Sequence, residues 1–196
     1  MKSKAESEIN NIRQQVENCK NCPLWKTRLN PVAGEGMVIA KVMLIGEAPG
    51  KNEDIKGRPF VGRAGKLLDE LICLIGMRRN DFFITNIVKC RPPKNRNPLK
   101  TEIKTCTNYL DKQIKLIHPQ IIVPLGNFAT SYILKKFCIL EGKIGKIHGE
   151  IYQMKNKSID SNIIPMYHPA AAIYNPNLKE TLEKDFKKIR NLLYNK

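Results

Sequence analysis

Two cysteines near the beginning of the chain have a spacing that suits metal binding. Cys19 and Cys22 are separated by two residues, and Pro23 follows the second thiol. Thiols at this spacing can bind one metal centre, and a Pro after the second is typical of ferredoxin ligand runs. Redox dithiols and zinc knuckles share the spacing, so a metal site requires partners elsewhere in the chain. Cys90 opens a basic loop, residues 89–98, and Cys106 lies in the helix predicted after it.

A second group of reactive side chains follows a predicted strand. The four apolar residues 42–45 predict a short strand buried on both faces, and residues 46–50 form a Gly-rich turn. In an open α/β sheet, ligands bind in the crevice beyond the carboxyl ends of the strands. Glu47, Glu53 and Asp54 are therefore expected at a ligand site, although a strand that runs into a Gly-rich loop occurs in many nucleotide-binding folds.

Three more side chains are expected at strand ends or on loops. Asn86 lies near the end of a predicted strand over residues 81–88, and its amide could read one edge of a base, although capping the local backbone is a commoner role. His168 ends the last predicted strand and is better placed for chemistry than His118, whose His-Pro ends a helix. Phe60 lies on a loop rich in Gly and Pro, where anchoring that loop in the core is the alternative role.

The composition describes a globular chain with a strong positive charge. Its 196 residues, 42% of them hydrophobic, fit a single domain over residues 1–196 with a full core. Thirty-four Lys and Arg against 18 Asp and Glu leave a net charge of +16. This charge favours a polyanionic partner and salt-dependent affinity. An AT-biased genome or a thermophile's charged surface would give a similar composition, so charge alone suggests nucleic acid without establishing it.

The sequence favours an intracellular, cytoplasmic protein. The N-terminal segment is polar and has no apolar core of a signal peptide, and no apolar run approaches the ~20 residues that span a bilayer. Thiols stay reduced in that compartment, so the six cysteines are expected to be metal ligands or core residues and not disulfides.

The pattern of apolar residues predicts one α/β/α domain with a short, mostly parallel four-stranded sheet and helices on both faces. Helical spacing predicts helices over residues 6–17, 65–75, 99–117, 127–137 and 178–194. Apolar runs predict strands at 42–45, 81–88, 121–126 and 163–167, with 151–154 pairing with the last strand around a polar tip at 155–162.

In this order, the pieces closely resemble the family 4 uracil-DNA glycosylases, the iron-sulfur branch of the uracil-DNA glycosylase superfamily. The resemblance covers nearly all of residues 19–176 and rests on five separated motifs. These are residues 19–22, residues 46–50 with Glu53 and Asp54, residues 57–62, residues 85–93 and residues 168–170.

The resemblance implies an enzyme that hydrolyses the bond between uracil and deoxyribose in DNA, leaving an abasic site for base excision repair. The base must be extruded into a pocket, because its target atom is hidden in a duplex. By their family counterparts, Phe60 would stack on the uracil and the Asn86 amide would bond O4 and N3–H, a pattern that cytosine cannot match. His168 would bond O2 and stabilise the anionic leaving group. Backbone amides of the turn beginning at Gly46 would help to hold the ring.

The roles of the two glutamates follow less directly from the resemblance. In the best-known branch of the superfamily an Asp positions the attacking water, and the matching residue here is Ala48. Glu47 is the preferred group for positioning water or stabilising the sugar cation, with Glu53 shaping the pocket wall near uracil C5.

The resemblance also implies that Cys19, Cys22, Cys90 and Cys106 bind a 4Fe-4S cluster. The sequence chemistry shows only that four thiolates are available, and a structural zinc site with four cysteine ligands stays an alternative. A structural role is favoured over redox sensing, because the cluster would fix the basic loop where the DNA backbone could pass.

Contacts to DNA are expected from the basic loop and from the last motif. Arg91, Lys94 and Arg96 would lie near phosphates. Family relatives commonly have Leu residues after the His-Pro as a wedge, whereas this chain has Ala171-Ala172-Ile173-Tyr174. Ile173 is then the expected wedge, with Tyr174 stacking on bases. The expected partner is uracil-containing DNA, single- or double-stranded. The protein is expected to be a monomer and not to associate with a membrane.

Two other classes of protein share part of this pattern. A noncatalytic iron-sulfur protein that binds nucleic acid or senses damage would keep the cysteines and the charge, but would not need Phe60, Asn86 and His168 together. A Rossmann-like nucleotide-binding enzyme would need a Gly-x-Gly-x-x-Gly turn or a P-loop, which the chain lacks.

Overall fold

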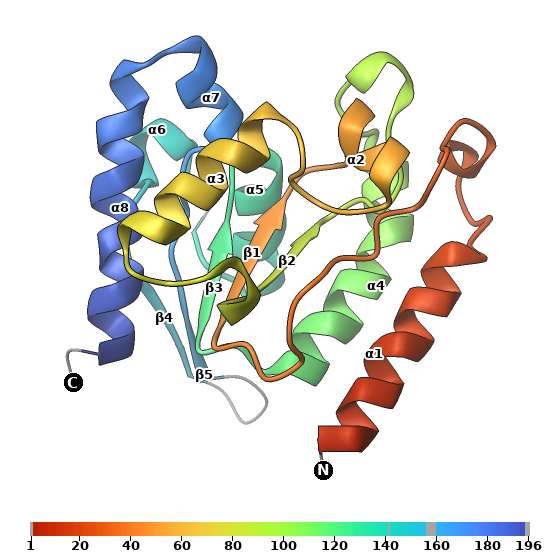
Figure 1. The fold of residues 1–196 in the computed structure, drawn as a ribbon, viewed down its shortest axis with the longest axis horizontal. Coiled ribbons are helices and arrows are strands. Elements are labelled where there is room, and N and C mark those ends of the chain that lie inside the picture. The colour runs from red at the N-terminus through yellow and green to blue at the C-terminus, as the bar shows by residue number, and fades with distance from the viewer. Residues whose placement is uncertain (1, 141, 156–159, 195–196) are drawn as a thin grey trace.

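A mostly parallel sheet runs through the centre of the computed structural model, which describes residues 2–140, 142–155 and 160–194 (Figure 1). In these residues the sheet has five strands in the order β2-β1-β3-β5-β4, and only β4, at one edge, is antiparallel to its neighbour. The strands are β1 (Val42–Gly46), β2 (Phe82–Asn86), β3 (Ile121–Pro124), β4 (Tyr152–Lys155) and β5 (Asp160–Ile163).

The predicted architecture is confirmed, but the count of four strands was one too low. β4 joins the sheet as an edge strand beside β5, so the expected pairing of 151–154 adds a fifth strand. The expected polar tip at 155–162 is shorter, because Lys155 and 160–162 belong to strands, and its residues 156–159 lie outside the described part of the chain. Parallel pairing continues beyond β5, since Met166 N–H donates to the Pro124 carbonyl at 3.0 Å.

The five predicted helices are confirmed, with shifts of a few residues at their ends. Short helices were missed, including one where a loop was expected. α2 begins because the Glu53 carboxylate accepts from Gly50 N–H (3.2 Å), and it ends at Gly57, whose φ of 66° is left-handed. The helices are α1 (Lys2–Glu17), α2 (Lys51–Lys56), α3 (Arg63–Leu74), α4 (Lys100–Ile117), α5 (Asn127–Lys136), α6 (Ile144–Ile147), α7 (Pro169–Tyr174) and α8 (Asn177–Tyr194), with 3₁₀ turns η1 (Pro23–Lys26), η2 (Arg79–Asp81) and η3 (Pro93–Asn95).

None of the described helices is both long enough and apolar enough to span a membrane.

The strands divide their side chains between two cores. Met43 and Ile45 of β1 face a core built with α1, α4 and α5, whereas Val42 and Leu44 face a core built with α3, α7 and α8. In Figure 1 the first group of helices lies on one side of the sheet and the second on the other. The order of the strands explains this division. The chain crosses the sheet in one direction from β1 to β2 and returns from β2 to β3, so right-handed connections put α3 and α4 on opposite faces.

All four parallel strands point their carboxyl ends toward the same edge of the sheet. The loops at that edge carry the motifs 46–50, 57–62, 85–93 and 168–170. One of these loops is fixed by close packing at the start of α3. A Cβ on Gly65 would overlap the backbone carbonyl of Phe60, so only glycine lets the helix approach the loop.

We predict that Gly65→Ala destabilises the protein by about 1–3 kcal/mol, because the added methyl group meets backbone and not a movable side chain. The free energy of unfolding, measured by urea denaturation, tests this. Gly145→Ala is the matched control, since its Cβ would contact only Tyr167 Oη at 3.5 Å. Equal stability of Gly65→Ala and wild type would contradict the packing described here.

Candidate active site and metal centre

A pocket of about 400 Å³ opens beyond the carboxyl ends of β1 and β2. Its walls come from the turn after β1, the loop before α3, the end of β2, η3 and the start of α7. The lining residues are Glu47, Ala48, Gly50, Glu53, Phe60, Ala64, Asn86, Asn95, His168 and Ala170. The structure therefore brings together Glu47, Glu53, Phe60, Asn86 and His168, as the sequence predicted.

The floor of the pocket depends on the missing side chain of Gly46. The parallel register pairs Gly46 with Asn86, the last residue of β2. A Cβ on Gly46 would overlap Asn86 Oδ1 and come within 2.7 Å of Phe60 Cζ. The Asn86 side chain is 2% exposed, and within the described residues its amide has no hydrogen-bond partner in the protein. A buried amide that lines a pocket without a protein partner is available to a polar ligand.

Phe60 is held in the pocket in a strained backbone conformation. Its φ of 50° is left-handed, which is rare for an aromatic residue. Contacts on both sides of Phe60 hold it there: Arg79 donates to the Pro59 carbonyl at 2.7 Å, and Glu53 Oε1 accepts from Val61 and Gly62 N–H, each at 2.8 Å. The Glu53 carboxylate also caps α2, so it fastens two pocket loops together.

His168 presents a neutral hydrogen-bond donor to the pocket. It caps α7, and its Nδ1 accepts from Ala170 N–H at 3.1 Å, which leaves the ring proton on Nε2. Burial lowers the pKa of His168 to about 4, and the nearby Glu53 carboxylate opposes this only in part. The ring also stacks on Phe60, with centroids 5.4 Å apart and planes 24° apart.

Glu47 supplies a carboxylate with spare acceptor capacity. Its backbone carbonyl accepts from Val88 N–H at 3.0 Å, which extends the pairing of β1 and β2, while its side chain lines the pocket. No hydrogen bond to the Glu47 carboxylate occurs among the described residues. Burial raises the pKa of Glu47, so this carboxylate takes up a proton more readily than an exposed one.

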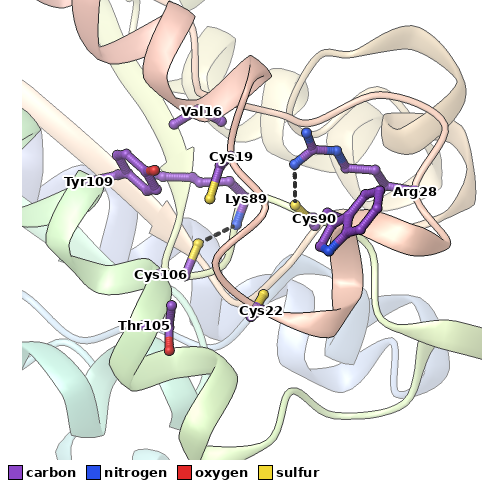
Figure 2. Close-up of a pocket in the computed structure, with 10 residues that line it drawn as sticks. Val16, Cys19, Cys22, Arg28, Lys89, Cys90, Thr105, Cys106 and Tyr109 are labelled. Carbon is purple, nitrogen blue, oxygen red and sulfur yellow. Dashed lines mark hydrogen bonds between the residues drawn. The ribbon is translucent and has the colours of Figure 1, made fainter.

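The four cysteines of the sequence motifs surround a second, separate cavity (Figure 2). Cys19 and Cys22 come from the segment between α1 and η1, Cys90 from the loop after β2, and Cys106 from α4. Cys73 and Cys138 are exposed and outside this cavity, so these two are neither ligands in this cavity nor core residues.

Hydrogen-bond donors point at two of the sulfurs. Arg28 Nη1 donates to Cys90 Sγ at 3.0 Å, and the backbone N–H of Lys89 donates to Cys106 Sγ at 3.2 Å, as Figure 2 shows. Burial raises the pKa of the Cys106 thiol to about 12, and the Lys89 charge lowers it only in part. Donors and cations beside buried sulfurs suit thiolates that carry negative charge toward a metal.

Four cysteine thiols around one cavity fit a metal centre with four thiolate ligands, which describes both a 4Fe-4S cluster and a structural zinc ion. Among the described residues, no group of three or more His, Cys, Asp or Glu side chains converges closely enough to hold one metal ion. Tetrahedral zinc would take all four thiolates on one ion, whereas each iron of a 4Fe-4S cluster would take its own thiolate.

Lys89 departs from its predicted place in an exposed basic loop. It is 1% exposed, and its ammonium group lies between the cysteine cavity and the end of β2. Burial lowers the pKa of Lys89 to about 8, and the sulfurs of Cys106 and Cys90 oppose this shift. The residue pattern did not predict this buried position, because lysine is almost never fully buried.

The expected DNA contacts are placed unequally. Lys94 is exposed in η3, whereas Arg96 forms two hydrogen bonds with the buried Glu102 at 2.7 and 2.9 Å, and Arg91 donates to Asn95 at 2.7 Å. Asp54, expected at the ligand site, is instead buried. It does not line the pocket and accepts from Leu29 N–H at 2.9 Å.

The last motif is likewise divided between core and surface. Ile173 packs against the core on the α3 and α8 face, whereas Tyr174 is 87% exposed. Ile173 is thus half-buried and Tyr174 is open to solvent, and the wedge and stacking roles of the two residues stay predictions.

A known protein family matches the part of this sequence that forms the whole described sheet. Residues 33–193 match the uracil DNA glycosylase superfamily, a range that includes all the described strands and all the pocket-lining residues. The chain therefore belongs to the uracil-DNA glycosylase superfamily.

Within that superfamily the similar proteins share one type. The chain is 52% identical to the type-4 uracil-DNA glycosylase of Sulfurisphaera tokodaii over 185 residues, which cover 94% of this chain and 84% of the relative. The type-4 enzyme of Saccharolobus solfataricus is 50% identical, covering 94% and 86% of the two chains, and that of Archaeoglobus fulgidus is 44% identical, covering 94% and 92%. The family resemblance seen in the motifs is thus confirmed, and the chain is a member of the type-4 branch.

Sequence reasoning missed the pocket residues that carry no chemical signature. Asn95 lines the pocket from η3, and Ala64 and Ala170 line it from the first turns of α3 and α7. Only the left-handed φ of 54° at Asn95, a conformation that Asn tolerates, agrees with its residue type.

We predict that His168 stays neutral from about pH 5 to 8, with its proton on Nε2. Burial lowers its pKa from 6.5 to about 4, so the charged form gains population only as the pH falls toward that value. A pH titration of the imidazole nitrogen chemical shifts by NMR measures both the titration midpoint and the tautomer of His168. The His168→Asn variant identifies which signals belong to His168. A midpoint near 6.5 would show that the ring is solvated and not held as described.

Proposed function

We propose that this protein is a DNA-repair enzyme that extrudes uracil from DNA and hydrolyses its N-glycosidic bond, leaving an abasic site. The observation that carries this function is the convergence of Phe60, Asn86 and His168 on one pocket. Extrusion costs a few kcal/mol, roughly, and is cheapest for a mispaired base. The pocket, about 400 Å³, is within the range of sites that bind small molecules.

Asn86 is proposed to select uracil by its hydrogen-bonding edge. Its amide nitrogen donates to uracil O4 and its Oδ1 accepts from N3–H. Cytosine presents the opposite pattern, so it would leave a buried amide unpaired, which gives strong discrimination.

Phe60 is proposed to stack on one face of the base, with His168 beside the edge of the base and not over its other face. Two stacked contacts of about 3.5 Å each need about 7 Å between the outer rings. The Phe60 and His168 centroids are only 5.4 Å apart, so the base does not insert between them. His168 then meets the edge of the base, where O2 lies.

In the proposed reaction, the bond between uracil N1 and sugar C1′ breaks with its electron pair going to the base. His168 Nε2–H donates to O2 and stabilises the developing negative charge, a role that a neutral imidazole fulfils at neutral pH. The Glu47 carboxylate stabilises the sugar cation and orients a water molecule. The water oxygen bonds to C1′, and Glu47 accepts a proton from it.

Glu53 is proposed as a positioning residue. Its carboxylate accepts three backbone N–H groups, so it holds the loop of Phe60 in place. Glu53 forms part of the pocket wall, as expected from the sequence, while its carboxylate is engaged in these backbone hydrogen bonds.

On the DNA side, Lys94 is proposed to contact phosphate, and the exposed Tyr174 to stack on bases next to the extruded nucleotide. We expect the enzyme to act inside the cell on single- or double-stranded uracil DNA, as a monomer with one domain over residues 1–196.

We further propose that Cys19, Cys22, Cys90 and Cys106 hold a 4Fe-4S cluster with a structural role. When bound, the cluster would tie the segment after α1 to α4 and to the loop after β2. The four thiols around one cavity and the two donors on sulfur support a thiolate metal centre, and the similarity to type-4 enzymes favours a cluster over a zinc ion.

We predict cleavage at uracil only, when the protein is incubated with an oligonucleotide carrying one uracil and abasic sites are then cleaved by alkali. Single-stranded, U·G and U·A substrates rank its preference. His168→Ala should lower kcat by about 10²–10³-fold, because it removes a donor to developing charge. Asn86→Ala should lose uracil selectivity together with rate. His118→Asn is the matched control, since His118 is exposed and outside the pocket.

Glu47→Gln in the same assay separates chemistry from binding. It should lower kcat with little change in KM, because the amide keeps the shape of the side chain but cannot accept the proton. A kcat equal to that of wild type would remove Glu47 from the reaction. No cleavage by cluster-loaded wild type would favour the noncatalytic DNA-binding alternative.

We predict that Cys106→Ala loses iron, acid-labile sulfide and visible absorbance, and that it unfolds at a lower temperature than wild type. Cys138→Ala is the control and should keep all three, because Cys138 is exposed and outside the cavity. Metal analysis decides between the two centres. One zinc per chain in wild-type protein, with no sulfide, would overturn the cluster.

A further inference from the structure

Lys89 joins the cysteine cavity to the base pocket through its own atoms. Its backbone N–H donates to Cys106 Sγ at 3.2 Å, and the next residue in the chain is Cys90. Its side chain turns back along β2, where Nζ donates to the Asn86 carbonyl at 2.8 Å. Asn86 is the residue whose amide lines the pocket, so one lysine contacts both sites.

The other partners of the Lys89 ammonium are uncharged. Nζ donates to Thr85 Oγ1 at 2.6 Å and to Gln113 Oε1 at 2.8 Å, which uses its three protons together with the Asn86 carbonyl. Within the described residues it forms no ion pair with a carboxylate. A buried charge with satisfied hydrogen bonds still needs a counter-charge nearby.

The cysteine sulfurs are the groups that can supply this counter-charge. Cys90 and Cys106 line the same cavity as Lys89, and Cys106 Sγ lies 3.2 Å from the Lys89 backbone nitrogen. Arg28 donates to Cys90 from another element, so each of these two sulfurs has a nitrogen donor or cation beside it. Thiolates bound to iron keep their negative charge, whereas protonated thiols would leave the ammonium uncompensated.

We propose that Lys89 is a positioning residue that couples the cysteine site to the base pocket. Its ammonium group is the counter-charge to the thiolates of a loaded cluster, and it anchors the end of β2 from which the Asn86 amide reaches the base. This inference rests on the proposed function and deepens it. The cluster acquires a specific effect on uracil recognition, beyond holding the chain together.

The test compares Lys89→Met with Lys187→Met in cluster-loaded protein. Methionine fills the same space without charge or donors, and Lys187 is exposed on α8, away from both sites. Two quantities are measured: the midpoint potential of the cluster, and the affinity for free uracil by calorimetry. Removing a cation near the cluster disfavours its reduced, more negative form, so Lys89→Met should shift the potential to more negative values.

The same variant should bind uracil roughly tenfold more weakly, because the Asn86 carbonyl loses a charged donor. Lys187→Met should match wild type in both measurements. A lower melting temperature with unchanged potential and unchanged uracil affinity would overturn the proposal and leave Lys89 a packing role. Failure of wild-type protein to release uracil from DNA would instead count against the proposed function.

Gln113→Glu covers the case in which Lys89→Met does not fold or load. The substitution puts a carboxylate in place of the amide oxygen that lies 2.8 Å from Lys89 Nζ. The ammonium group then pairs with this carboxylate, so it compensates less of the negative charge on the sulfurs. The potential should again shift to more negative values, while uracil affinity stays within about twofold of wild type because the bond to the Asn86 carbonyl remains. An unchanged potential in Gln113→Glu would overturn the proposed charge coupling.

Discussion

The close approach of the β1 backbone to two side chains is the constraint on which the site depends. Gly46 lies in register with Asn86, and the space that a side chain of Gly46 would need is occupied by Asn86 and Phe60. The Asn86 amide and the Phe60 ring thus both pack against the backbone of Gly46. The polar edge and the stacking surface required by a planar base follow from that contact. His168 completes it from the run that pairs with β3.

Several charged side chains around the site form hydrogen bonds that fix the conformation of its loops. Glu102 takes both donors of Arg96 as well as Leu99 N–H at 2.7 Å, and Glu53 takes three backbone amides. The charge of the chain therefore serves two purposes. Buried or half-buried partners rigidify the segments around the pocket, and exposed lysines such as Lys94 are the ones proposed to contact the phosphate backbone. A net charge of +16 says nothing about which residues serve which purpose.

The sequence predicted features that depend on residue type and order. Buried apolar runs identified β1, β2 and β3, whereas the strand expected at 163–167 overlaps β5 only at Ile163. The rule that ligands bind beyond strand ends identified Glu47, Asn86 and His168 as neighbours. Features that depend on tertiary contacts could not be predicted. The burial of Lys89 contradicts the usual behaviour of lysine, and only the fold decides that Ile173 packs partly against the core while its neighbour Tyr174 is exposed. The edge strand β4 was foreseen as a hairpin partner but not counted in the sheet.

The position of the cysteines also has a consequence for how the protein is made. α1 packs on α4, where Lys112 Nζ donates to Gln15 Oε1 at 3.0 Å, and Cys19 and Cys22 face Cys106 across the cavity. α1 therefore has no α4 to pack on until α4 has been translated, because the chain is made from its N-terminal side. Until then the apolar stripe of α1 and the two thiols that follow it are open to solvent, oxidants and stray metals. The thiols of Cys19 and Cys22 meet Cys106 only after α4 has been made, so the cysteine cavity is completed well after its first two cysteines are synthesised.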